Sequence, residues 1–281
     1  MGSFSIAQTG AALGAVVAGL QPSRVTDAEL VELQQAYADA EVLFFTDLQM
    51  EPQEHIDFAR RFAQINVNRF FTPVEGFAEI AEVREEPHQT SNSGGGWHTD
   101  HSYDAIPAMG SMAYARTLPS SGGDTLFASM TQAFAALSPG LQESLLSLKA
   151  VHSSRHAFGA AAPVPEDLRG RFGNEDKALQ DAVHPVVVKH PLSGKPALYV
   201  NPAFTLHFDG WTAQESAPLL QFLYQHAAKP EFTYRYRWQP NSMAFWDNRA
   251  TWHYALNDYP GQRRLLHRIT LEGVALGPAL S

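Results

Sequence analysis

Two histidines and an aspartate lie close together in the segment SGGGWHTDHSYD, residues 93–104. His98 and Asp100 are two positions apart, so on extended backbone both side chains project to the same side. This spacing suits two ligands of the 2-His-1-carboxylate facial triad, which holds Fe(II) in non-haem oxygenases. A simple His–Asp hydrogen bond on a strand is the alternative interpretation. His101 projects to the other side, and we predict that it is a non-ligand at the rim of a pocket.

A third metal ligand would have to come from elsewhere in the chain, and His253 is the candidate. It precedes the segment RRLLHRITL, in which Arg264 and Arg268 share one face of a strand, roughly 13 Å apart at ~3.3 Å per residue. Guanidinium groups clamp carboxylates and related oxyanions. One arginine could therefore hold a dicarboxylate cosubstrate and the other an anionic substrate, unless each pairs with an acidic residue of a neighbouring strand.

The segment PSSGGDTLFAS, residues 119–129, predicts a turn that leads into a strand. Gly122 and Gly123 permit the backbone angles that such a turn requires. Thr125 begins the strand, and its hydroxyl could form a hydrogen bond with a bound carboxylate. A plain hairpin turn is the alternative interpretation of this segment.

The composition is that of a folded, acidic protein. Of the 281 residues, 44% are hydrophobic and 17% charged, which provides for a sizeable core, and the net charge of −9 argues against a nucleic-acid or membrane-surface partner. The chain has no cysteine, so a metal must be held by histidines and carboxylates. The apolar stretch at residues 6–24 is interrupted and lacks a basic leader, so we expect strand–turn–strand there and a cytoplasmic enzyme.

The remaining pattern predicts an antiparallel β core decorated with helices, in one domain spanning residues 1–281. Thr26 and Glu29 form a capping-box pattern at the start of a helix. Further helices are expected at 52–65, at 129–148 with a break at Pro139, and at 212–228. Strands are expected at 41–48, 110–118, 182–190, 196–201, 232–238, 242–248 and 263–273. Residues 66–96 are expected to form a mobile, irregular loop around a short strand, and 159–182 a lid or surface excursion.

Taken together, the motifs WHTDHSY, LPSSGGDTLFAS, HPVVVKHPLSGKPALYVNPAFT, KPEFTYRYRWQPNSMAFWDNRATWHYALNDY and QRRLLHRITLEG closely resemble the taurine-dioxygenase-like (TauD/TfdA) family of Fe(II)/2-oxoglutarate-dependent dioxygenases. The resemblance runs from about residue 5 to 273. It implies a double-stranded β-helix, or jelly roll, with flanking helices. It also implies Fe(II) bound by His98, Asp100 and His253, with 2-oxoglutarate and O₂ as cosubstrates.

The same resemblance implies roles for residues around the metal. Arg264, helped by Thr125, would bind the distal carboxylate of 2-oxoglutarate, and Arg268 would bind the anionic group of the substrate. The reaction would hydroxylate a substrate C–H bond and release succinate and CO₂. Family resemblance also makes a homodimer or homotetramer the expected assembly.

The chain departs from taurine-using members in its expected substrate pocket. Where those members hold taurine with a His, a Tyr and an Asn, this chain has Asn68, Phe71 and Gly94. With Phe158 and Phe204, Phe71 would form an apolar wall, although each phenylalanine could equally belong to the core. We therefore expect a small organic acid other than taurine, such as a sulfonate, alkyl sulfate, aryloxyalkanoate or carboxylate.

Three alternatives remain on the sequence alone. The same iron chemistry could oxidise a natural-product or amino-acid intermediate, with Arg268 binding a carboxylate. A jelly-roll protein could use the His/Asp/His cluster for structural or hydrolytic Zn²⁺, which accepts the same donors; Arg264 and Thr125 would then have no ligand to hold. A binding module with a dead site would be expected to lack a ligand residue, and none is missing.

Overall fold

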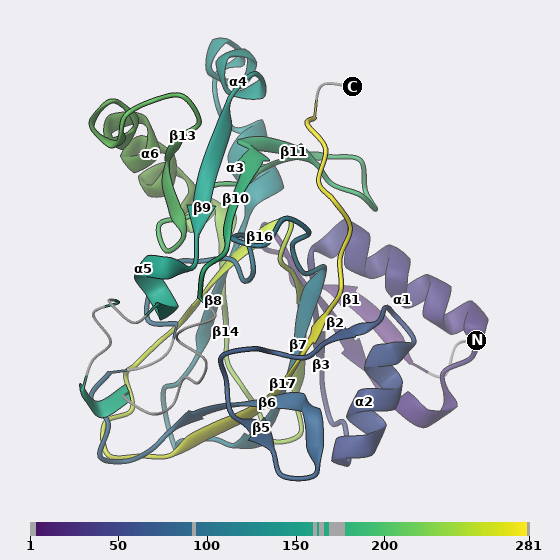
Figure 1. Ribbon diagram of the computed structural model, residues 1–281. Helices are drawn as coiled ribbons and strands as arrows, with labels where there is room; N and C mark the ends of the chain where they lie inside the picture. The colour runs from purple at the N-terminus through teal and green to yellow at the C-terminus, as the bar shows by residue number, and fades with distance from the viewer. Residues whose placement is uncertain (1–3, 92–93, 160–161, 163–165, 169–177, 280–281) are drawn as a thin grey trace.

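A nine-stranded sheet forms the framework of the molecule in the computed structural model, which describes residues 4–91, 94–159, 162, 166–168 and 178–279 (Figure 1). In spatial order its strands are β1 (Ser5–Gln8), β2 (Ala15–Ala18), β3 (Val42–Phe45), β15 (Met243–Asp247), β7 (Gly110–Thr117), β17 (Arg264–Leu271), β6 (Phe77–Glu85) and β5 (Pro73–Val74), with β4 (Ile65–Asn66) paired to β17. Neighbouring strands in the described chain are antiparallel, apart from the parallel pair β2 and β3.

Three smaller sheets complete the β structure of the described residues. One consists of β14 (Thr233–Tyr236), β8 (Thr125–Ser129) and β16 (Thr251–Ala255); the second of β10 (Asp181–Pro185), β9 (Lys149–Ser153) and β13 (Thr205–Phe208); the third of β11 (Val187–Lys189) and β12 (Pro196–Leu198). The predicted strands in the C-terminal third and the strand–turn–strand at the N-terminus are confirmed.

Strand β3 shows how the large sheet is buried on both faces. Val42 and Phe44 pack into a cluster with Phe127 of β8, which places the β14–β8–β16 sheet against this face. Leu43 and Phe45 project to the opposite face and pack into the cluster that contains side chains of helices α1 (Asp27–Ala40) and α2 (Pro52–Arg60). Alternation along a strand produces this division, and burial of each of these side chains contributes roughly 1.5–3 kcal/mol.

Helices cover the outer face of the large sheet and the end of the smaller ones. Helices α1 (Asp27–Ala40) and α2 (Pro52–Arg60) lie beside β1–β3, whereas α3 (Met130–Ala135), α4 (Pro139–Leu146) and α6 (Ala213–Ala227) gather near β9, β11 and β13 (Figure 1). The predicted capping box of α1 is confirmed, with Thr26 and Glu29 exchanging side-chain-to-backbone hydrogen bonds. None of the described helices combines the length and hydropathy needed to cross a membrane.

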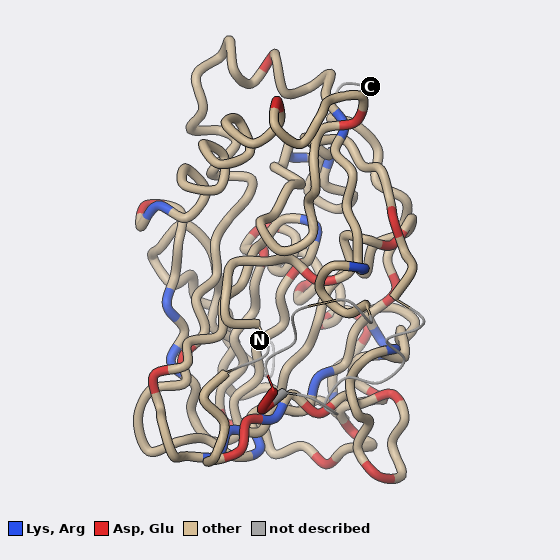
Figure 2. Tube along the Cα trace, turned by 60° about the vertical axis from the view of Figure 1, so that its left-hand side comes forward, with Lys and Arg blue, Asp and Glu red and all other residues tan. Residues whose placement is uncertain are grey.

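The short strand expected within residues 66–96 is present, but it is longer than predicted, so less of this segment is irregular. The segment contains strand β6, nine residues long, which pairs with β17 from Arg264 to Arg268 and buries Ile80 completely. Most of the expected excursion at 159–182 lies outside the described residues; helix α5 (Arg155–Phe158) leads into it. The assignment of the whole chain to one domain stays a prediction. Acidic and basic residues are interspersed along the trace (Figure 2).

A buried carboxyl closes the C-terminal end of helix α1. Glu41 adopts a left-handed backbone conformation (φ 65°), is 5% exposed, and accepts a hydrogen bond from the Thr131 hydroxyl. Burial raises the pKa of Glu41 from 4.5 to about 7, against the smaller effect of the hydrogen bond. Because the pKa of Glu41 is higher in the folded than in the unfolded state, the folded state favours the protonated carboxyl. The free energy of unfolding therefore decreases as the pH rises from about 4.5 to about 7.

Glu41→Gln is therefore expected to stabilise the protein at alkaline pH. The amide keeps an acceptor for Thr131 and never ionises, so its advantage should grow from below ~1 kcal/mol at pH 5 to about 3 kcal/mol at pH 8. Denaturant unfolding at the two pH values measures this difference. Glu32→Gln, on the exposed face of α1, is the control; an E41Q advantage that is the same at both pH values would contradict the prediction.

Candidate active site

Two of the predicted metal ligands are joined by their own backbones. The His98 amide donates to the His253 carbonyl at 3.1 Å, and the His253 amide donates to the His98 carbonyl at 2.8 Å. His253 lies on β16, while Asp100 stands at the start of the turn that follows His98. One ligand atom from each of His98, Asp100 and His253 lies within 4.8 Å of the other two. The structure thus brings together the three residues that the sequence proposes as ligands.

The protonation states of His253 and Asp100 suit a metal cation. Burial, with a further effect of His98, holds the pKa of His253 well below its usual range, so its imidazole is neutral. Burial alone would raise the pKa of Asp100, but the Arg268 charge holds it well below its usual range. His98 Nδ1 lies 2.9 Å from the Gly96 carbonyl, which leaves Nε2 as the free ligand atom. Neutral imidazoles and an ionised carboxylate are the forms that bind metals.

Arg268 occupies the space between the trio and the apolar part of the site. Its Nη1 donates to Asp100 Oδ2 at 3.3 Å, and its guanidinium carbon lies 4.6 Å from the centre of the Phe71 ring. The Nε atom is buried and has no hydrogen-bond partner within the described chain. Arg268 is thus partly paired with a carboxylate, as the alternative interpretation of its strand allows, yet it keeps donors for a ligand.

Arg264 lies further along the same face of β17 and has no carboxylate partner in the part of the chain that the structure describes. It is 2% exposed, and its Nε donates to the Gly123 carbonyl at 3.0 Å. Its Nη2 approaches Thr125 Oγ1 at 3.4 Å. Burial lowers the pKa of Arg264, and this effect exceeds the opposing effects of Tyr259, Glu85 and Asp124 nearby.

One cavity of about 530 Å³ connects these groups. It lies between the large sheet and the β14–β8–β16 sheet, and its lining includes every residue predicted for the site: His98, Asp100, His253, Arg264, Thr125, Arg268, Asn68, Phe71, Gly94, Phe158 and Phe204. His101 also borders it, outside the ligand trio, as predicted. Sequence reasoning missed Trp238, Tyr103 and His156. The sequence does contain a pattern that could have indicated Trp238, because this residue ends the alternating segment TYRYRW.

Aromatic rings form one wall of the cavity. Phe158 stacks on Phe70 with 4.7 Å between ring centres, and Tyr103 meets Phe204 edge to face at 4.9 Å. Asn68 also borders the cavity, but its Oδ1 accepts hydrogen bonds from the Phe70 and Phe71 amides at 2.9 Å each. The side-chain carbonyl of Asn68 therefore stabilises the local backbone turn, and the side-chain amide nitrogen remains as a hydrogen-bond donor.

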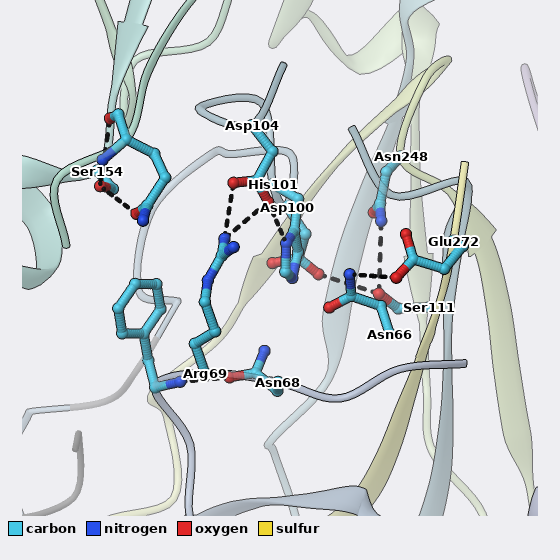
Figure 3. A network of polar contacts seen from close by, with 12 residues as sticks. Asn66, Asn68, Arg69, Asp100, His101, Asp104, Ser111, Ser154, Asn248 and Glu272 are labelled. Carbon is cyan, nitrogen blue, oxygen red and sulfur yellow. Dashed lines mark hydrogen bonds and ion pairs between the residues drawn. The ribbon is translucent and has the colours of Figure 1, made fainter. Parts of the chain in front are cut away.

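A hydrogen-bonded network ties this wall to the metal-ligand turn. Figure 3 shows Arg69 extending to Asp104, whose carboxylate it meets at 2.7 and 2.8 Å. His101 Nδ1 donates to the same carboxylate at 3.0 Å. Ser111 donates to Asp100 at 3.2 Å, and Asn248 lies beside Ser111 (Figure 3). The segment that carries Phe71 is thereby connected to the turn that carries Asp100.

Gly94 leaves room next to the ligand edge of His98. Its φ is +86°, and a Cβ placed there would lie 3.2 Å from His98 Cε1 and 3.7 Å from Nε2. The Gly94 carbonyl accepts a hydrogen bond from the Ala255 amide, so this backbone is fixed beside β16. A side chain at this position would be strained by the positive φ, and its Cβ would press against Cε1 of His98, next to the ligand atom.

Comparison with known proteins agrees with this geometry. Residues 5–270 match the family described as taurine catabolism dioxygenase TauD, TfdA family. The chain is 32% identical to an alpha-ketoglutarate-dependent sulfate ester dioxygenase of Pseudomonas putida, covering 93% of this chain and 87% of that protein. It is 28% identical to an (S)-phenoxypropionate/alpha-ketoglutarate-dioxygenase of Sphingobium herbicidovorans, covering 96% of both.

Solved structures show the same fold. A taurine dioxygenase from Burkholderia xenovorans superposes with a TM-score of 0.82 at 29% identity, covering 99% of this chain and 93% of that one. AAD-2 in complex with Mn(II) and N-oxalylglycine gives a TM-score of 0.82 at 25% identity, covering 98% and 100%. The predicted jelly-roll core with flanking helices is confirmed. The chain belongs to the TauD/TfdA family of Fe(II)- and 2-oxoglutarate-dependent dioxygenases.

Proposed function

We propose that His98, Asp100 and His253 hold the Fe(II) of this dioxygenase. The donor set fits the ion, because two imidazoles, of which that of His253 is neutral, and one ionised carboxylate converge within 4.8 Å in a cavity wall. Three protein ligands leave open positions for a cosubstrate and O₂. When bound, the Fe(II) supplies the oxidising chemistry, in which 2-oxoglutarate and O₂ yield succinate, CO₂ and a hydroxylated substrate.

Arg264 and Thr125 are proposed to bind the distal carboxylate of 2-oxoglutarate. The observation that carries the proposed function is the burial of Arg264 in the same cavity as the ligand trio, without a carboxylate partner in the described chain. A buried cation is costly unless an anion pairs with it. A dicarboxylate that reaches from the metal position to Arg264 would provide that anion.

Arg268 is proposed to bind the anionic group of the primary substrate. Its guanidinium projects between Asp100 and the Phe71 ring and keeps a buried Nε without a protein partner in the described residues. Phe71, Phe158 and Phe204 would contact the rest of the substrate. The chain's own contribution to catalysis is thus to fix the anion, place the apolar body near the metal ligands, and exclude water with aromatic rings.

The substrate that fits this site is an anion with an apolar body, such as an alkyl sulfate ester or an aryloxyalkanoate. A sulfate ester dioxygenase and a phenoxypropionate dioxygenase are among the relatives. Taurine carries a charged amine, which needs acceptors. The side-chain carbonyl of Asn68 already accepts hydrogen bonds from two backbone amides, so it is a poor acceptor for the amine of taurine.

A substrate screen tests the proposal. Purified protein with Fe(II), 2-oxoglutarate and O₂ is expected to form succinate at least ~10-fold faster with a medium-chain alkyl sulfate or a 2-phenoxypropionate than with taurine, since unpaired polar groups are rejected strongly. Arg268→Gln should raise KM for the active anion while leaving the affinity for 2-oxoglutarate nearly unchanged. Equal turnover of taurine would contradict the proposed substrate class, and no 2-oxoglutarate turnover with any acid would contradict the proposed site.

A further inference from the structure

We propose that Trp238 is a positioning residue for the cosubstrate: its indole N–H fixes the Thr125 hydroxyl so that the hydroxyl proton is presented to the distal carboxylate of 2-oxoglutarate. The inference rests on the proposed role of Thr125 and Arg264. Trp238 lines the cavity, is 8% exposed, and lies just beyond β14, the strand that pairs with β8 and places Tyr236 opposite Thr125.

The hydrogen bonds at Thr125 determine where its proton can go. Trp238 Nε1 donates to Thr125 Oγ1 at 3.0 Å, and Arg264 Nη2 approaches the same oxygen at 3.4 Å. A hydroxyl has one proton and two acceptor lone pairs. The two N–H groups occupy both lone pairs of Thr125 Oγ1, so the hydroxyl can form a further hydrogen bond only by donating its own proton. Within the described chain, no acceptor lies in range of that proton, so a carboxylate oxygen in the cavity would be its partner.

The indole also contacts the second carboxylate-binding group. The guanidinium carbon of Arg264 lies 5.6 Å from the Trp238 ring centre, within the range of a cation–π interaction. On its other side, Trp238 packs edge to face with Tyr236 at 5.0 Å. One rigid side chain therefore contacts both Thr125 and Arg264, and the ring that supports Arg264 cannot turn without breaking the bond to Thr125.

Two roles for Trp238 must be separated by experiment. If it only packs, a phenyl ring should serve nearly as well, because it fills most of the same space and still presents a π face to Arg264. If the indole N–H orients Thr125, a phenyl ring leaves the hydroxyl free to rotate and to donate elsewhere. The affinity for 2-oxoglutarate then falls even when the fold is intact.

Trp238→Phe is expected to weaken 2-oxoglutarate binding about tenfold, the effect of losing one oriented hydrogen bond to a charged group. Binding is measured by titration calorimetry on Mn(II)-loaded protein without O₂, so the readout does not depend on turnover. At saturating 2-oxoglutarate, kcat should be nearly that of the wild-type protein. The matched control is Trp252→Phe, which loses an indole hydrogen bond of the same length, 3.0 Å to the Val200 carbonyl, on the opposite face of β16 from His253.

A double substitution decides whether Trp238 acts through Thr125. Thr125→Val should also weaken 2-oxoglutarate about tenfold, and adding Trp238→Phe to it should change the affinity little further. The proposal would be overturned if the double variant lost affinity for 2-oxoglutarate by the product of the two single losses. It would also be overturned if Trp238→Phe bound 2-oxoglutarate as tightly as the wild-type protein. If Trp238→Phe does not fold, Thr125→Ser replaces it. A serine hydroxyl oriented by Trp238 should bind 2-oxoglutarate nearly as well as threonine, and an affinity as weak as that of Thr125→Val would overturn the proposal.

The same titrations separate this inference from the proposed function. Wild-type protein that does not bind 2-oxoglutarate in the presence of Mn(II) would contradict the proposed cosubstrate site as a whole. Normal wild-type binding together with unchanged Trp238→Phe binding would contradict only the role of Trp238.

Discussion

Replacing Asp100 with asparagine will abolish turnover and weaken metal binding by more than ~100-fold. Loss of a residue that only hydrogen-bonds to a metal ligand already weakens metal binding by ~10- to 100-fold, and Asp100 is proposed as a ligand itself. Asn keeps the size of the side chain but removes the negative charge that faces the His98 and His253 imidazoles. It also removes the anion that pairs with Arg268 at 3.3 Å. A metal cation held by the remaining ligands would then be repelled by the nearby Arg268 guanidinium, with no Asp100 carboxylate to offset the repulsion.

Titration with Mn(II), followed by electron paramagnetic resonance, measures the metal affinity apart from activity. Asp209→Asn, at an exposed aspartate, is the control and should bind the metal as the wild-type protein does. His98→Ala should behave like the Asp100 variant, because it removes another member of the trio. Full Mn(II) affinity in Asp100→Asn would contradict the assignment of this carboxylate as a ligand.

Replacing Arg264 with methionine is expected to weaken 2-oxoglutarate binding about 100-fold or more. Loss of one partner of a buried, hydrogen-bonded charge pair costs ~2–5 kcal/mol, and each 1.4 kcal/mol is tenfold in affinity. Methionine fills much of the same volume without the charge. Because Arg264 has no carboxylate partner in the described chain, its removal leaves no buried acid unpaired.

The melting temperature without ligand should therefore change little in Arg264→Met, while stabilisation by added 2-oxoglutarate should be lost. Arg263→Met is the matched control: it is the preceding residue, its side chain is 46% exposed, and it contacts Glu86 at 3.5 Å on the surface. A variant with a clearly lower melting temperature that still binds 2-oxoglutarate normally below that temperature would show that Arg264 is structural and that another residue holds the carboxylate.

Local sequence signals were sufficient for much of the framework and for part of the site. The capping box at Thr26 and Glu29 is a short-range pattern, and it predicts the start of α1 correctly. Period-two alternation identified β17 and placed Arg264 and Arg268 on one face, and both line the cavity. His98 and Asp100 were proposed from their spacing, although the backbone turns at Asp100 instead of continuing as a strand. The choice of His253 among twelve histidines depended on family resemblance.

Other features depend on contacts that no local pattern records. Strand β6 contains three glutamates and one arginine, so only a short strand was expected there, and its full length of nine residues depends on its pairing with β17. The contact between Arg268 and Asp100 joins residues 168 positions apart. Trp238 ends an alternating aromatic segment that is equally typical of a core, and its bond to Thr125 spans 113 positions. Such pairings are decided by the packing of two sheets.

The reciprocal backbone bonds between His98 and His253 have a consequence for the order of folding. Thr99, next to His98, also bonds to the Asn248 carbonyl, 149 positions away, so the two halves of the ligand set come from distant parts of the chain. Closing a loop of this length has a large entropic cost before any contact compensates for it, and chains with many such contacts fold slowly. The metal pocket should thus be among the last parts to assemble, so Mn(II) should slow unfolding more than it speeds refolding.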